Sequence, residues 1–264
     1  MQTLSSRIDM TDFLRRLETA NRRVLMLDYD GTLAPFRIKP KQASPYPGVV
    51  ELLDELVAQE GTRVVIVSGR RAAEVSSLLS LDRQPEIWGA HGWERLSPDG
   101  GAYQQEPEAA VREALTLAEA GVVDLRRTGA RLEHKPASVA VHWRGLPVPT
   151  VAKVREELTS MWGPIADEGV LELLPFDGGL ELRARGNNKQ AAVRAVLAET
   201  PPDAVSAYLG DDVTDEDAFR AVKPRGLAVL VRPEYRKTAA DVWIRPPHEL
   251  LAFIERWRRS GSAS

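Results

Sequence analysis

The sequence contains no cysteine, which excludes disulfide frameworks, zinc–thiolate sites and thiol nucleophiles. It also has no apolar run approaching the roughly eighteen residues of a membrane-spanning helix. Neither charge dominates, because 35 basic and 38 acidic residues give a formal net charge of −3. This balance argues against a protein that coats nucleic acid. We therefore expect no nucleic-acid partner, no membrane partner and a cytoplasmic location.

A chain of 264 residues, 43% of them apolar, is long enough to bury one or two substantial cores. Residues 1–23 carry charges throughout and lack a continuous apolar stretch, so they predict a capped amphipathic helix rather than a targeting segment. Residues 258–264, at the other end, are expected to be frayed.

Short apolar runs rich in Val, Leu and Ile alternate with helical patterns toward both ends of the chain. Predicted strands cover residues 24–30, 62–69, 86–92, 204–212, 226–231 and 241–244, and predicted helices cover 47–59, 71–79, 189–198 and 214–222. Strands that are apolar throughout and separated by helices are typical of a parallel sheet covered on both faces. The predicted fold class is α/β, with a doubly wound parallel sheet.

The middle of the chain shows a different pattern. Helices are predicted at 107–120 and 150–162 and strands at 131–134, 138–143, 169–174 and 179–183, with turns at 98–101 and 177–179. Strands with turn-like connections, flanking two helices, indicate an inserted α+β domain. The predicted organisation is a core of residues 1–101 and 184–264 with a smaller insert at residues 102–183, and a cleft between the two lobes.

The first predicted strand ends in Asp28 and Asp30. Because the carboxyl ends of parallel strands open onto the ligand crevice, both carboxylates are expected at the functional edge of the sheet. Carboxylates spaced i and i+2 repel each other unless a cation or a proton separates them. A polar strand-to-loop turn is the alternative, since Asp and Gly are common in turns.

A second acidic segment follows the apolar run that begins at residue 204. Asp215, Glu216 and Asp217 have a structural explanation, because carboxylates in the first turn of a helix complement its dipole. That explanation does not cover Asp211 and Asp212, which are expected at the strand end itself. Gathering these acids with those of the first strand is unfavourable without a divalent cation, and oxygen-only ligands select Mg²⁺. The sequence therefore predicts a magnesium site.

Two further groups suit an anion. Ser68, followed by Gly69 and Arg70, ends a predicted strand at the start of a helix, where free backbone N–H groups and a hydroxyl bind anions. Lys189 opens a helix, where the dipole disfavours a cation, so a negative partner is expected. Alternatively, Ser68 only caps the helix and Lys189 is solvated.

These four segments together resemble the motifs of the haloacid dehalogenase-like phosphohydrolases, in the same order. The matching segments are DYDGTL at 28–33, Ser68, Lys189 and GDDVTDEDAF at 210–219. More narrowly, nearly the whole chain resembles the trehalose-6-phosphate phosphatases. The further matching pieces are VVIVSGR at 64–70, the turn at 89–92 with Glu94, segments 133–135 and 138–144 in the insert, and segments 180–183 and 186–189.

The resemblance implies a Rossmann-like core in which Asp28 attacks phosphorus and forms an aspartyl-phosphate. Asp30 would protonate the leaving sugar oxygen and then activate water. Ser68, Lys189 and the neighbouring Gly69 and Arg70 would hold the phosphate oxygens. The implied Mg²⁺ set is Asp28, the Asp30 backbone carbonyl and Asp211, supported by Asp212 and Asp215.

The substrate implied by the resemblance is trehalose 6-phosphate, hydrolysed to trehalose and phosphate. The insert resembles the mobile cap of these enzymes, which would close over the sugar and exclude water. Candidate sugar or pocket contacts are His91, Glu94, Lys135, Glu181 and Asn188. For each of these a purely structural role is the alternative. A sugar-phosphate-forming glycosyltransferase is the expected link in the pathway.

Three alternative functions remain at this point. The first is a phosphatase for another glycosyl phosphate, namely glucosylglycerol phosphate, sucrose 6-phosphate or mannosyl-3-phosphoglycerate. The second is a phosphomutase on the same scaffold, and the third is a catalytically silent sugar-phosphate sensor. A sensor has no need of a nucleophile paired with a proton donor, so the presence of Asp28 with Asp30 argues against it.

Overall fold

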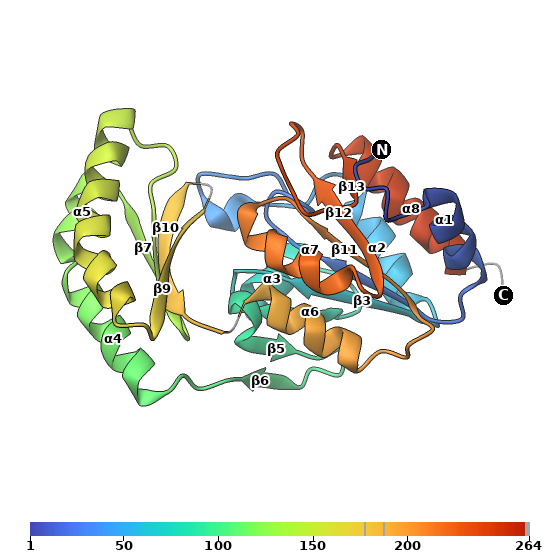
Figure 1. Ribbon diagram of the computed structural model, residues 1–264, viewed down its shortest axis with the longest axis horizontal. Helices are drawn as coiled ribbons and strands as arrows, with labels where there is room; N and C mark the ends of the chain where they lie inside the picture. Colours follow the sequence, from blue (N-terminus) through green and yellow to red (C-terminus); the bar gives the residue numbers. More distant parts are fainter. Residues whose placement is uncertain (177, 187, 262–264) are drawn as a thin grey trace. The chain divides into compact units, whose positions relative to one another are not determined.

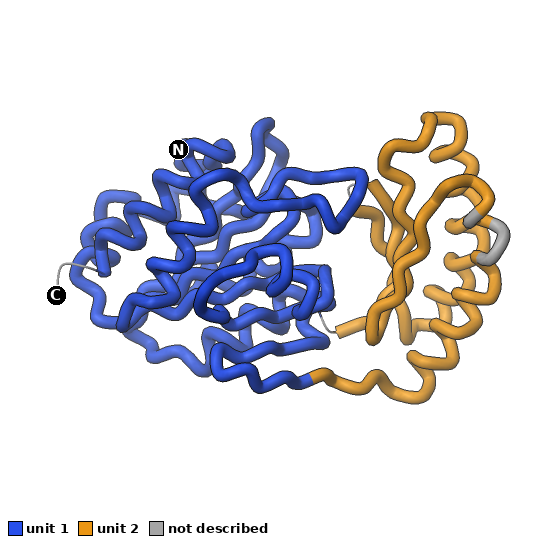
Figure 2. The backbone as a smooth tube through the Cα atoms, turned by 180° about the vertical axis from the view of Figure 1, so that it is seen from behind, with its two compact units in different colours: residues 1–103, 188–264 blue, residues 104–187 orange. Residues whose placement is uncertain are grey.

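The structure is a computed structural model that describes residues 1–176, 178–186 and 188–261. Three parts of the predictions lie outside this part of the chain: Asp177 of a predicted turn, Asn187 of the matched segment 186–189, and the last three residues of the predicted frayed tail. The chain divides into two compact units (Figure 2). The first unit comprises Met1–Tyr103 and Asn188–Ser264, and the second comprises Gln104–Asn187.

The first unit is built on a nine-stranded sheet (Figure 1). In spatial order its strands are β1 (Gln2–Thr3), β13 (Val242–Ile244), β12 (Gly226–Val231), β11 (Val205–Gly210), β2 (Arg23–Leu27), β3 (Thr62–Val67), β4 (Glu86–Gly89), β5 (Glu94–Leu96) and β6 (Ala102–Gln104). The six strands from β13 to β4 are parallel, whereas β1 and β5 pair antiparallel with β13 and β4. Every residue of β2 and β11 is buried, as expected for central parallel strands.

Helices cover both faces of this sheet. They are α1 (Met10–Thr19), α2 (Val49–Ala58), α3 (Ala72–Leu79), α6 (Lys189–Ala198), α7 (Glu216–Val222) and α8 (His248–Gly261). Leu25 and Leu27 of β2 pack in one apolar cluster with side chains of α1, α2, α3 and α8, whereas Met26 packs in another with side chains of α6 and α7. Alternate residues of one strand thus enter two cores, which confirms the α/β, doubly wound fold.

The two ends of the chain differ in how well the sequence predicted them. The expected capped amphipathic helix is α1, whose N-cap Asp9 accepts hydrogen bonds from two backbone N–H groups and whose Phe13 and Leu17 are buried. The expectation of a frayed tail is wrong for residues 258–261. Helix α8 extends to Gly261, because Arg258 and Arg259 pair with Glu255 one turn earlier.

The second unit contains an antiparallel sheet with strand order β7 (Arg131–Lys135), β8 (Ser138–His142), β10 (Gly179–Ala184) and β9 (Leu171–Phe176). Helices α4 (Ala109–Ala120) and α5 (Val148–Asp167) pack against it (Figure 1). The register pairs Glu133 with Ala140 and Ala140 with Glu181, so both glutamates lie on one sheet face. Among the described residues, no helix has the length and apolarity needed to cross a membrane.

Candidate active site

Three adjacent strands of the first unit end in polar side chains. Asp28 directly follows β2, and β2 lies between β3, which is followed by Ser68, and β11, which is followed by Asp211. The Asp28 N–H continues the sheet by donating to the Leu209 carbonyl at 2.9 Å, and the Ser68 N–H donates to the Trp88 carbonyl at 2.8 Å. The strand register therefore brings these side chains to one edge, as the sequence predicts.

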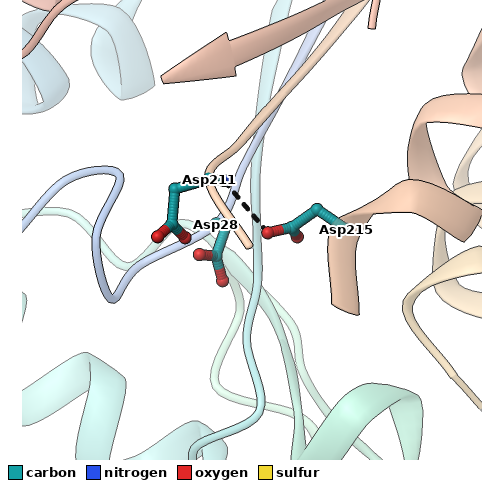
Figure 3. A group of neighbouring side chains, drawn as sticks. All are labelled: Asp28, Asp211 and Asp215. Carbon is teal, nitrogen blue, oxygen red and sulfur yellow. Dashed lines mark hydrogen bonds between the residues drawn. The ribbon is translucent and has the colours of Figure 1, made fainter. Parts of the chain in front are cut away.

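Asp28, Asp211 and Asp215 form a buried acidic cluster (Figure 3). One carboxylate oxygen from each lies within 4.8 Å of the others, and the three residues are 3%, 2% and 0% exposed. Two glycines make this approach possible. A Cβ at Gly31, whose φ is +83°, would lie 2.1 Å from Asp211 Oδ2, and a Cβ at Gly210 would lie 2.5 Å from Asp215 Cγ.

Lys189, the first residue of α6, enters this cluster. Its buried Nζ donates to Asp28 Oδ1 at 2.6 Å and to Asp215 Oδ1 at 2.7 Å. These bonds supply the negative partner that its position at a helix N-terminus led us to expect. Burial alone lowers a lysine pKa, but here the two carboxylates outweigh it and raise the pKa of Lys189. The ammonium is therefore charged at neutral pH.

The three carboxylates have different electrostatic environments. Burial, opposed by the charge of Lys189 and assisted by the charge of Asp215, raises the pKa of Asp28 to about 7. Burial, followed by the charges of Asp28 and Asp215, raises the pKa of Asp211 well above its ordinary value. Burial also raises the pKa of Asp215, but the charge of Lys189 and the hydrogen bonds from Lys189 and Tyr208 outweigh burial and lower this pKa overall. A single ammonium does not balance three carboxylates.

The donor set fits a hard divalent cation. Within the described residues, Asp211 Oδ1 is buried and has no hydrogen-bond partner, which is costly for a carboxylate oxygen unless a cation contacts it. The ligand atoms available are carboxylate oxygens, the type that Mg²⁺ prefers. Asp28 and Asp211 are therefore the best-placed residues to hold such an ion.

Asp215 has a different set of contacts. Its Oδ1 accepts from Lys189 and from the Tyr208 hydroxyl at 2.6 Å, and its Oδ2 accepts from the backbone N–H groups of Asp211 and Asp212 at 3.0 Å each. Asp215 is the last residue of the short helix Val213–Asp215, and these bonds fix the backbone of the neighbouring Asp211 and Asp212. Glu216 and Asp217 occupy the first turn of α7. The Asp212 side chain caps the short helix by accepting from the Val213 N–H.

The predicted anion-binding turn lies at the edge formed by β3. Ser68 is 1% exposed and its Oγ accepts the Arg70 N–H at 3.2 Å. Gly69 packs against the imidazole of His91, since a Cβ there would lie 2.7 Å from His91 Cε1. His91 is buried, has a positive φ of 59°, and donates its backbone N–H to the Ser68 carbonyl. These residues form one packed turn.

Arg70 contacts Asp30 rather than the acidic cluster. Its Nε donates to Asp30 Oδ2 at 2.6 Å and its Nη2 donates to Asp30 Oδ1 at 2.8 Å. The Asp30 side chain is 27% exposed, compared with 5% for Asp28. The two aspartates of the first motif thus have separate cationic partners.

Two predicted sugar contacts act as helix caps. Asn188 is the N-cap of α6, where its Oδ1 accepts the Ala191 N–H at 3.1 Å. Glu94 is 7% exposed, accepts the Ala72 N–H at the start of α3 at 2.7 Å, and pairs with Arg71 at 2.8 Å. Both residues have a structural use, and their roles toward a substrate stay predictions.

We expect Glu94→Ala to lower the free energy of unfolding by about 1 kcal/mol, because it removes the cap from α3. Glu94→Gln is the matched control, since the amide oxygen still accepts the Ala72 N–H. Urea unfolding followed by tryptophan fluorescence measures the difference. An unchanged unfolding midpoint for Glu94→Ala, together with a raised KM, would instead identify a substrate contact.

The remaining predicted contacts, Lys135 and Glu181, form a pair within the second unit. Lys135 Nζ donates to Glu181 Oε1 at 3.0 Å, and the Ser138 hydroxyl donates to the same oxygen at 2.7 Å. Both charged side chains are nearly buried, at 8% and 4% exposed. Both residues thus have a structural partner within this unit, and their roles toward a substrate stay predictions.

Two arginines that contact Asp211 and Asp212, Arg232 and Arg236, were not predicted from the sequence. Arg236 donates from Nε to the Asp211 carbonyl at 3.1 Å and from Nη2 to the Asp212 carbonyl at 2.6 Å. Glu216 pairs with Arg236. Arg232 lies 3.9 Å from Asp211 Oδ2. Because Arg232 directly follows β12, the strand-end argument that identified Asp28 and Asp211 would also have found it.

Comparison with known families and proteins gives consistent matches. The trehalose-phosphatase family model matches residues 26–242. A trehalose-phosphate phosphatase of Mycobacterium ulcerans is 36% identical over 257 residues, which cover 90% of this chain and 62% of that protein. An uncharacterised glycosyl hydrolase of Mycobacterium tuberculosis is 34% identical over 271 residues, covering 96% of this chain and 20% of that protein. The chain thus spans one fifth to about three fifths of the length of these relatives.

A solved structure matches over the full length of both chains. It is the C-terminal domain of the Candida albicans trehalose-6-phosphate phosphatase, with 19% identity, a TM-score of 0.80 and 100% coverage of each chain. At this level of identity the likeness establishes the fold alone.

Proposed function

Because this chain belongs to the trehalose-phosphatase family, we propose that it is a Mg²⁺-dependent phosphatase that hydrolyses trehalose 6-phosphate to trehalose and phosphate. The observation that carries the proposal is the convergence of Asp28, Asp211, Asp215 and Lys189 in one buried cluster. A buried carboxylate beside a fixed ammonium and an unpartnered carboxylate oxygen is suited to phosphoryl transfer. The proposal includes a cytoplasmic location.

In this proposal Asp28 is the nucleophile that attacks phosphorus, and Asp30 exchanges protons with the leaving sugar oxygen and then with water. Lys189, fixed by two short hydrogen bonds, orients Asp28 and supplies positive charge toward the phosphate. Ser68 and the amides of the Ser68–Gly69–Arg70 turn contact the phosphate oxygens. Mg²⁺, when bound, neutralises charge so that an anionic carboxylate can approach an anionic ester.

Substrate selection is assigned to both units. We assign residues 102–183 as the cap domain and residues 1–101 with 184–264 as the catalytic core. Lys135 and Glu181 of the cap, and His91, Glu94 and Asn188 of the core, are the candidate contacts. The buried charge pair Lys135–Glu181 supports this assignment, since buried groups that hydrogen-bond a sugar hydroxyl discriminate strongly against analogues that lack it. The proposal also includes a pathway link to a glycosyltransferase that forms the sugar phosphate.

A panel of phosphate esters tests the substrate. Release of inorganic phosphate is measured with trehalose 6-phosphate, glucosylglycerol phosphate, sucrose 6-phosphate and mannosyl-3-phosphoglycerate at equal concentration with Mg²⁺. The proposal predicts the highest kcat/KM for trehalose 6-phosphate. No turnover of that ester, with turnover of another, reassigns the substrate within the same chemistry, and isomer formation without free phosphate indicates a phosphomutase.

Removal of the metal is expected to stop phosphate release. Dialysis against a chelator removes the cation that Asp28 and Asp211 would hold, so activity should fall to background and return when Mg²⁺ is added. Isothermal titration calorimetry of the chelator-treated protein measures binding separately from activity. We expect Asp211→Asn to abolish Mg²⁺ binding. Full activity in the presence of chelator would contradict the assigned metal site.

A further inference from the structure

The guanidinium of Arg70 is held on three sides. Its Nε and Nη2 bind the two carboxylate oxygens of Asp30, and its Nη1 binds Glu74, one turn along on α3. The buried ring of Tyr29 lies beneath it, with the guanidinium carbon 5.7 Å from the ring centroid. Such a two-bond pair fixes direction as well as distance, because the planar fork of arginine matches a carboxylate.

The supports of Arg70 are themselves fixed. The Tyr29 hydroxyl donates to the Ala43 carbonyl at 2.6 Å. The backbone of Arg70 is bound at both ends, since its N–H donates to Ser68 Oγ and its carbonyl accepts the Ala90 N–H at 2.6 Å. The Arg70 side chain is 11% exposed. The arginine is therefore a rigid element, whereas Asp30 is more exposed and directly precedes Gly31, whose φ is +83°.

Within the part of the chain that the structure describes, the hydrogen bonds to the Asp30 carboxylate come from Arg70. The direction of that carboxylate thus depends on this one side chain. Three guanidinium nitrogens of Arg70 are engaged by Asp30 and Glu74. This arrangement directs Arg70 toward a neighbouring carboxylate, and not toward the cluster of Asp28, Asp211 and Asp215.

We propose that Arg70, supported by Glu74, is a positioning residue that aims Asp30 at the leaving-group oxygen. The inference rests on the proposed function, because it needs Asp30 to exchange protons with the substrate. Proton transfer depends on hydrogen-bond geometry, and a misplacement of about 1 Å reduces the rate about 100-fold. Loss of Arg70 therefore lowers kcat/KM, which reports the first phosphoryl transfer, to the extent that the leaving group needs a proton. The later activation of water by Asp30 enters kcat for every ester alike.

Two esters separate this role from phosphate binding. A sugar alkoxide is a poor leaving group and needs a proton, whereas 4-nitrophenolate leaves without one. We measure kcat/KM for trehalose 6-phosphate and for 4-nitrophenyl phosphate in wild type, Arg70→Met and Asp30→Asn. Arg70→Met is expected to lower kcat/KM for the sugar ester about 10- to 100-fold more than for the aryl ester, and Asp30→Asn is expected to shift the ratio further in the same direction.

Glu74→Gln and Arg71→Met complete the set. Glu74→Gln loosens Arg70 without removing it, so a smaller shift in the same ratio is expected, and this variant decides the matter where Arg70→Met does not fold. Arg71→Met is the matched control, because this neighbouring arginine is 56% exposed and pairs with Glu94. Its ratio should equal that of wild type.

The outcomes distinguish a failure of this inference from a failure of the proposed function. Equal losses on both esters in Arg70→Met and Glu74→Gln, with an altered ratio in Asp30→Asn, overturn the inference and leave the proposed function in place. That result shows that Arg70 acts on the phosphate or on stability. If Asp30→Asn also reduces both esters equally, the proton-transfer role of Asp30 in the proposed function is wrong, and the inference fails with it.

Discussion

Asp28→Asn is expected to reduce phosphate release from trehalose 6-phosphate by at least about 10⁴-fold, because an amide does not attack phosphorus as a carboxylate does. Asp28 is buried and accepts a hydrogen bond from Lys189. Asparagine has nearly the same volume as aspartate, and its amide oxygen still accepts that hydrogen bond. The fold should therefore be retained. A coupled assay for inorganic phosphate measures the loss, and circular dichroism checks the fold.

Asp12→Asn is the matched control for this variant. Asp12 lies on α1, is 45% exposed and pairs with Arg15 on the surface, so the same chemical change should leave turnover at the wild-type level. Retention of more than a few per cent of wild-type activity in Asp28→Asn would show that another group attacks phosphorus.

Lys189→Met is expected to remove activity and to lower the free energy of unfolding by about 3–5 kcal/mol, because it leaves the buried carboxylates of Asp28 and Asp215 without their shared cation. Urea unfolding in the absence of Mg²⁺ measures the stability. Lys153→Met, at a lysine that is 72% exposed on α5, is the control and should change the unfolding free energy by less than about 0.5 kcal/mol.

A double variant tests whether charge causes that loss. Lys189→Met combined with Asp28→Asn removes one of the two unpaired carboxylates, so it should be more stable than Lys189→Met alone by at least about 1 kcal/mol. Additive destabilisation in the double variant would mean that the effect of Lys189 arises from packing and not from its ion pairs.

The parallel sheet could be predicted because its strands are apolar along their whole length. Strands such as β2 and β11 bury every residue, and this burial leaves a continuous apolar run in the sequence. The same sheet ends in short strands, the two-residue β1 at one edge and the three-residue β5 and β6 at the other. These strands carry no such run, so pairing with a neighbour, rather than local pattern, defines them.

The position of the acidic residues could also be predicted from the sequence, but some of their partners could not. A parallel strand order brings Asp28 and Asp211 to one edge whatever follows them, and the unfavourable position of Lys189 at a helix N-terminus indicated an acidic partner. The pair between Arg70 and Asp30 joins residues forty positions apart, and nothing in either segment specifies it. Likewise, the frayed-tail expectation failed because Ser260 is 5% exposed in a helix that packs on the core.

The most direct measurement is the location of the transferred phosphoryl group. Asp30→Asn, in which the second step lacks its base, is mixed with 4-nitrophenyl phosphate and Mg²⁺, quenched in acid and digested, and the phosphorylated peptide is sequenced by mass spectrometry. A burst of 4-nitrophenolate with the phosphoryl group on Asp28 is the predicted result. A burst that places the phosphoryl group on any other residue, or turnover with no burst and no phosphorylated peptide, would contradict the assignment of Asp28 as the nucleophile.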